Sequence, residues 1–328
     1  MGTKALLGEI VGDILHVTFS DRHFVYGWNK PLLSKKSKIS GYTVITLAVA
    51  KYIMENHHLY EGRVEPERSE KRKELLSKTI LDLAKSHPEL DYPEWINKWL
   101  ASDKCIPTKD KDGMAGLCFI PLVNYFTCRF DLESIMRVLC ESMSVIITDI
   151  NSVLGTKAIT TAIYSNQRYN ISATQDFMAC LYDIRWPHEL KDIDSKYGWN
   201  TSLLKAMSPA LCVFYQGNNE FHRNRPVTDL RSALWMINRI EGLQTLVTPL
   251  VMTMMQATQG WYEFDELKEF RALLPADLLE INDKYFEFMG ERNVDYMPHD
   301  DEEDNSNNDD INPDKTGPMS FSDLLKLI

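Results

Sequence analysis

The sequence predicts an all-α protein built around one large core. No alternation of apolar and polar residues with a period of two persists anywhere along the chain, whereas several stretches repeat apolar residues at helical spacing. The chain has 328 residues and 44% hydrophobic content, which is enough for a sizeable core. We therefore expect helices that pack directly on one another in a single compact domain.

Residues 39–56 are predicted to form the central, buried helix of this domain. Val44, Leu47 and Met54 belong to a mostly apolar surface at helical spacing. Ser40 or Thr43 can cap the first turn, because a hydroxyl accepts a hydrogen bond from the backbone N–H groups that have no partner there.

The remaining helices follow from the same pattern. Residues 1–20 are expected to form a first helix, and residues 21–39 a loop with four exposed lysines. An amphipathic helix is expected within 61–86, with its charges on a solvated face. Asp131 is expected to cap a helix over 131–149. Further helices are expected over 156–165, 173–183, 201–215, 228–237, 243–258 and 276–289.

Composition and charge exclude several classes of protein. The six cysteines form no C-x-x-C pair and no zinc-binding spacing, which favours a reducing, cytoplasmic location. No signal peptide and no apolar run of about eighteen residues is present, so no membrane association is expected. The net charge is −11, of which the ten acidic and two basic residues of 295–328 contribute −8. A near-neutral body with an acidic tail argues against nucleic acid as a partner.

The acidic tail divides into two parts. Residues 293–318 are rich in Asp and Asn, and we expect a disordered linker because they contain too little apolar surface to offset ordering entropy. Residues 319–328 are expected to form a short amphipathic peptide, with Phe321, Leu324, Leu325 and Leu327 sharing much of one helical face. Phe321–Ile328 either binds a protein partner or folds back on the chain's own body, and the sequence leaves both alternatives open.

Two segments together resemble a known family. Residues 6–21 and 39–56 are similar, in order and spacing, to the opening of the ADP-ribosylglycohydrolases of the dinitrogenase-reductase-activating glycohydrolase type. The shared residues are Gly8, Ile10, Gly12, Asp13, Ile14 and Phe19, then Thr43, Val44, Thr46 and Leu47 to Ala50. The resemblance implies a compact, orthogonal helical bundle over residues 1–292. In the family, this fold hydrolyses ADP-ribosyl bonds with a pair of magnesium ions.

The departures from the family pattern fall on the metal ligands. The Thr-Asp-Asp of its first cluster, T-D-D-T, is replaced by Ser40, Gly41 and Tyr42, and only Thr43 matches. The acidic residue after its first motif falls on Ser20. The aspartates of its second cluster, G-G-D-S-D-T, fall on Gly242 and Gln244, followed by the matching Thr245. Magnesium prefers carboxylate and water oxygens, so we expect no metal cofactor in this chain.

A possible ligand pocket is also implied by the resemblance. Gly113, Met114, Ala115 and Gly116 fall within the family loop that packs against ADP-ribose, and Asn151 and Gly155 match two positions of a later motif. Asp13 and Ser20 complete the candidate pocket. We expect Asp13 to be a buried, hydrogen-bonded carboxylate and not a catalytic group. The small residues either contact a ligand or let two backbones approach closely.

Three functions are consistent with these observations. The first is a metal-free pseudoenzyme that binds ADP-ribose, a related nucleotide or a protein partner. The second is an active hydrolase with a rebuilt site, for which Glu9, Asp13, Asp21 and Glu241 are the candidate acids. The third is a scaffold protein that acts through its acidic tail.

Overall fold

The computed structural model describes residues 5–20, 26–60, 68–109, 113–168, 171–185, 193, 202–215, 229–240, 246–259 and 266–294. Within these ranges the regular structure is helical, apart from one isolated bridge between Thr108 and Ile147. The predicted all-α class is therefore confirmed. The tail, 295–328, lies outside the described residues, as do the expectations made for it.

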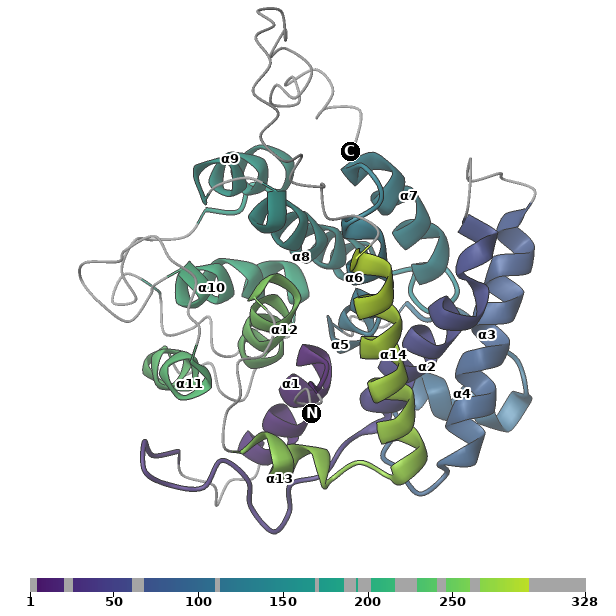
Figure 1. Cartoon of the computed structure of the whole chain (residues 1–328), viewed down its shortest axis with the longest axis horizontal. Coiled ribbons are helices and arrows are strands. Elements are labelled where there is room, and N and C mark those ends of the chain that lie inside the picture. The colour runs from purple at the N-terminus through teal and green to yellow at the C-terminus, as the bar shows by residue number, and fades with distance from the viewer. Residues whose placement is uncertain are drawn as a thin grey trace, which may run out of the picture.

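The described chain forms α-helices and one short 3₁₀ helix (Figure 1). Their order and bounds are α1 Gly8–Phe19, α2 Gly41–Asn56, η1 His57–Tyr60, α3 Ser69–Ser86, α4 Glu94–Ser102, α5 Gly113–Leu117, α6 Ile120–Thr127, α7 Leu132–Met143, α8 Ile150–Arg168, α9 Ile171–Tyr182, α10 Leu203–Tyr215, α11 Leu230–Arg239, α12 Val247–Gln259, α13 Leu267–Arg271 and α14 Ala276–Val294. Helix α14 runs two residues past the expected domain boundary at 292.

Helix α2 lies at the centre of the bundle and is buried along most of its length. It packs against α3, α14, α6 and α1, while α1 packs along α12. In the view of Figure 1, α2, α3 and α4 lie on one side of α14, and α8 to α12 lie on the other. Glycines make the α1–α12 contact possible, because a Cβ atom at Gly8 would lie 2.5 Å from the carbonyl oxygen of Met252.

Two helices are shorter than predicted because tertiary contacts hold the adjoining residues outside the helix, whereas α8 and α14 are longer than predicted. Helix α1 begins at Gly8 instead of residue 1: Leu7 is buried but not helical, and its N–H donates to Asn282 of α14. Helix α7 ends at Met143 instead of 149, because Thr108 pairs with the backbone of Ile146 and Thr148. Asp131 caps α7 as predicted, through a 2.7 Å hydrogen bond from the Ser134 N–H.

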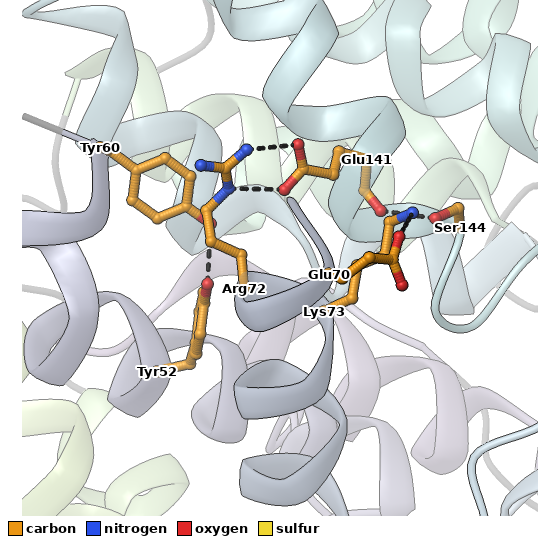
Figure 2. A network of polar contacts seen from close by, with 7 residues as sticks. All are labelled: Tyr52, Tyr60, Glu70, Arg72, Lys73, Glu141 and Ser144. Atoms are coloured by element: carbon orange, nitrogen blue, oxygen red, sulfur yellow. Dashed lines mark hydrogen bonds and ion pairs between the residues drawn. The ribbon is translucent and has the colours of Figure 1, made fainter. Parts of the chain in front are cut away.

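The expectation that the charges of α3 form a solvated face is wrong for Arg72. This side chain is 1% exposed and forms a bidentate ion pair with Glu141 of α7, with N–O distances of 2.6 and 2.7 Å. Its guanidinium lies 5.3 Å from the ring centroid of Tyr60, whose hydroxyl is 2.9 Å from that of Tyr52. Figure 2 shows this network joining α2, η1, α3 and α7. The nearby pair of Glu70 and Lys73 lies at the surface, as expected.

Removing only one partner of this buried pair should destabilise the protein strongly. Arg72→Met or Glu141→Leu alone leaves a buried charge without its counter-charge, which costs about 3–5 kcal/mol. The double variant should recover most of that loss, because no charge is then left behind. Denaturant unfolding measures both effects.

Arg137→Met is the matched control for this experiment. Arg137 pairs with Glu133 on the exposed face of α7, with both side chains about 60% exposed (60% and 61%). The loss of such a surface pair should cost less than about 1 kcal/mol. Equal losses for Arg72→Met and Arg137→Met would contradict a stabilising role for the buried pair.

Candidate functional site

The start of α2 is where the family resemblance places the first metal cluster. Asp13 of α1 reaches this point and is 1% exposed. Its carboxyl group accepts three hydrogen bonds, from the Ser40 N–H (2.9 Å), the Ser40 hydroxyl (2.6 Å) and the Thr43 hydroxyl (2.7 Å). Asp13 therefore joins α1 to the first turn of α2, and the expectation that it is a buried, hydrogen-bonded carboxylate is confirmed.

The backbone N–H and the hydroxyl of Ser40 both take part in this contact between α1 and α2. Ser40 is the N-cap of α2, and its hydroxyl oxygen accepts from the Tyr42 N–H at 3.2 Å while the hydroxyl donates to Asp13. Thr43, the alternative cap, donates to Asp13 instead. The hydroxyl groups at two metal-cluster positions thus hold protein atoms together.

The position of the next ligand, Gly41, is filled by a neighbouring aromatic ring. A Cβ atom at Gly41 would lie 2.3 Å from Cδ1 of Tyr92 and 2.9 Å from its Cα. The Gly41 N–H donates to the Asp91 carbonyl at 2.9 Å, and Asp91 also pairs with Lys38. An aspartate side chain has no space here, because the segment around Tyr92 packs directly against the start of α2.

Tyr92 itself is held firmly in this position. It is 9% exposed, and its hydroxyl donates to the Ala84 carbonyl of α3 at 3.2 Å. Burial raises the pKa of this phenol, so it stays neutral at physiological pH. The sequence carried no signal for this contact, because Tyr92 lies far along the chain from Gly41 and no local pattern links the two.

Tyr42 occupies the next position of the segment that resembles the family's metal cluster. It is half-buried against the core, and its carbonyl oxygen accepts from the Cys118 thiol at 3.6 Å. Since Cys118 follows directly after α5, this contact ties the entry of α2 to the next candidate segment.

The residues at the start of α2 do not fit a magnesium pair. Two committed hydroxyl groups, a glycine and a neutral phenol offer none of the free carboxylates that magnesium prefers. In the part of the chain that the structure describes, no group of three or more His, Cys, Asp or Glu side chains is placed to hold a metal ion. Gly242, Gln244 and Thr245, which match the second cluster, lie outside the described residues.

The glycines of the candidate pocket contact protein side chains. Gly113, Met114, Ala115 and Gly116 are all buried in α5. A Cβ atom at Gly116 would lie 2.0 Å from the Thr156 hydroxyl oxygen, and one at Gly155 would lie 2.7 Å from Cβ of Leu203. These distances favour close packing of α5, α8 and α10 over contact with a ligand.

The remaining candidates for the pocket, Ser20 and Asn151, are less buried. Ser20 is exposed, and its hydroxyl donates to the His16 carbonyl at 2.8 Å. Asn151 is half-buried in the first turn of α8, where Asp149 accepts from the Ser152 N–H at 2.9 Å. This last interaction stabilises the start of α8 and was not predicted.

Glu9 is the candidate acid with the most unusual environment. It lies one turn before Asp13 on α1, is 3% exposed, and neither carboxyl oxygen has a hydrogen-bond partner among the described residues. Burial raises the pKa of Glu9 to about 8. Burial also raises the pKa of Tyr285 on α14, and the proximity of Glu9 adds to this shift. Glu9 is therefore mostly neutral at pH 7 and is a poor metal ligand. Asp21 and Glu241 lie outside the described residues.

Comparison of the chain with models of known protein families, and with curated proteins, finds no match. Within the described ranges, no helix is both long enough and apolar enough to cross a membrane.

Gly41→Ala should destabilise the protein, because the new methyl group would overlap Tyr92. Overpacking of this kind costs about 1–3 kcal/mol. Gly290→Ala in α14 is the matched control, since nothing lies within 4 Å of its Cβ position. That variant should stabilise by about 0.4–1 kcal/mol, because alanine restricts the unfolded chain. If both changes shift the free energy of unfolding in the same direction, Tyr92 does not fill the site.

Glu9 should make the protein less stable as the pH rises. Its pKa is about 8 in the folded protein against an ordinary value of 4.5, so the folded state holds a proton that the unfolded state releases. Stability is then unaffected below about pH 4.5 and falls by about 1.4 kcal/mol per pH unit up to about pH 8. Glu9→Gln keeps the shape and removes the titration. Denaturant unfolding across this range should therefore show a shallower pH slope for the variant, and identical slopes would contradict the assignment.

Proposed function

We propose that this chain is a metal-free relative of the ADP-ribosylglycohydrolases that acts by binding and not by hydrolysis. The proposal joins the sequence resemblance over residues 6–54 to the all-α architecture. Its main support is the space at Gly41, which the Tyr92 ring occupies where the family has a metal-binding aspartate. The whole bundle would then have the compact, orthogonal arrangement of that family.

The chemistry at the start of α2 supports this reading. A metal pair would have to be held by carboxylates that point into a shared, hydrated space. Here Asp13 is turned to Ser40 and Thr43, and Glu9 is enclosed in an apolar environment. The competing proposal, an active hydrolase with a rebuilt site, therefore gains no acid from these two residues.

Two kinds of ligand are consistent with a binding protein of this class. ADP-ribose or a related nucleotide would bind beside α2, α5 and α8, where the resemblance places the family's ligand. A protein partner would instead use the outer surface of the bundle. The close contacts at Gly113 and Gly116 leave little space for a nucleotide. The titration with ADP-ribose that is described below therefore tests whether a nucleotide binds.

The purified protein should not bind a magnesium pair. Calorimetric titration with magnesium or manganese should give no stoichiometric heat and no thermal shift. A ligand present at 100 times its Kd would stabilise the native state by about 2.7 kcal/mol, so binding could not escape detection. A micromolar two-ion isotherm would overturn the proposal.

The same protein should be titrated with ADP-ribose and assayed on arginine- and serine-linked ADP-ribosyl substrates. Heat or stabilisation with ADP-ribose, without turnover, would support the nucleotide-binding form of the proposal. No response would support the protein-partner form. Metal-dependent release of ADP-ribose that is lost in Glu9→Gln would instead support an active, rebuilt site.

A further inference from the structure

The loop between α1 and α2 carries a concentrated positive charge. Within 26–40 it has four lysines and no acidic residue, and all four lysines are exposed. Lys38 pairs with Asp91, and Lys30, Lys35 and Lys36 lie along the same loop. In Figure 1 this loop runs along the lower edge of the molecule, from near α11 towards the start of α2. It therefore presents cationic groups to solvent in a protein whose net charge is −11.

Arg231 of α11 holds the first part of this loop in place. Its guanidinium donates to the carbonyl oxygens of Trp28 at 2.6 Å and Lys30 at 3.1 Å, and it pairs with Glu266. The hydroxyl of Tyr26 donates back to the Arg231 carbonyl at 3.0 Å. These contacts hold the loop backbone at Trp28 and Lys30 against α11.

Two exposed tryptophans belong to these segments, one to the loop and one to α11. Trp28 is 49% exposed and Trp235 is 44% exposed, and they are two of the four large hydrophobic side chains exposed in the described part of the chain. Trp235 lies one turn beyond Arg231 on the solvent side of α11, with the Arg239 guanidinium 4.7 Å from its ring centroid. Exposed aromatic rings beside cationic groups are typical of binding surfaces. We name this the lysine–tryptophan surface: Trp28, Lys30, Lys35, Lys36, Trp235 and Arg239.

The chemistry of this surface fits an acidic peptide that also carries apolar side chains. One such segment is in the same chain: residues 295–328 have a net charge of −8 and include Phe321, Leu324, Leu325 and Leu327. We propose that this acidic segment docks on the lysine–tryptophan surface of its own chain. Its carboxylates pair with the lysines and its apolar residues cover the tryptophan rings.

The segment is long enough to reach this surface. Its 34 residues follow directly after α14, and an extended chain of that length spans at most about 110 Å. The body has a radius of gyration of only about 19 Å, as expected for its size. A tether of this length gives an effective concentration in the mM range, so weak contacts suffice for docking.

The contact should be sensitive to salt. Each exposed ion pair contributes little alone, and salt screens charges over about 8–10 Å at physiological strength. The attractions between several carboxylates and several lysines add up, and added salt weakens each of them. This inference is independent of the proposed function, because none of these residues belongs to the start of α2.

Zero-length crosslinking of the full chain tests the docking directly. A carbodiimide joins a lysine amine to a carboxylate only where the two are in contact. The acidic run 300–310 should crosslink to Lys30, Lys35 and Lys36 at least about five-fold more often than to Lys71 and Lys78, which are exposed lysines of α3. About 0.5 M NaCl should remove most of this preference. Even crosslinking to all exposed lysines would overturn the proposal.

Isotope mixing and paired variants complete the experiment. In a mixture of ¹⁵N-labelled and unlabelled protein the crosslinks should join residues of the same isotope, and mixed pairs would assign the contact to a second copy instead. Lys30→Glu/Lys35→Glu should lose the crosslinks from the acidic run to Lys36, whereas the matched Lys71→Glu/Lys78→Glu should keep them. Neutralising Asp300, Asp301 and Glu302 to Asn, Asn and Gln should increase the oxidation of Trp28 and Trp235 in hydroxyl-radical footprinting. Unchanged oxidation would contradict coverage of the rings.

Discussion

The hydrogen bonds between Asp13 and the first turn of α2 are the joint on which this bundle depends. Asp13 lies on α1, which packs along α12, while Ser40 and Thr43 open α2, which packs against α3 and α14. This buried carboxyl group therefore links α1 to the start of α2, in addition to the packing between these helices. A buried acceptor needs hydrogen-bond partners to offset its desolvation, and here three donors supply them.

The same hydrogen bonds bear on metal binding at the positions that the family resemblance assigns to a metal cluster. The groups at these positions cannot both hold Asp13 and bind a metal ion. A hydroxyl group that donates to Asp13 is not available to coordinate a cation, and Gly41 leaves room for the ring of Tyr92. The family's arrangement needs carboxylates whose oxygens face solvent and metal. In this chain the start of α2 is occupied by protein contacts.

Arg72 and Glu9 show two opposite solutions to burying an ionisable group. Arg72 keeps its charge because Glu141 provides two hydrogen bonds in the planar geometry that guanidinium favours. Glu9 has no such partner, so its proton is retained and its pKa rises to about 8. The difference lies in the neighbouring helices, since α7 offers a carboxylate to α3 and no described element offers a cation to Glu9.

The sequence by itself determined the helical class, the buried character of α2 and the cap at Asp131, because apolar period and capping are local properties. For α2 it offered both Ser40 and Thr43 as caps, and the structure decided for Ser40. The sequence also showed that Ser40, Gly41 and Tyr42 carry no carboxylate, since residue identity is enough for that. Only the tertiary structure showed that Tyr92 fills the space at Gly41, that Arg72 is buried and that Arg231 of α11 holds the loop backbone at Trp28. These contacts join residues far apart along the chain, and their partners are chosen by three-dimensional packing, which no local pattern encodes.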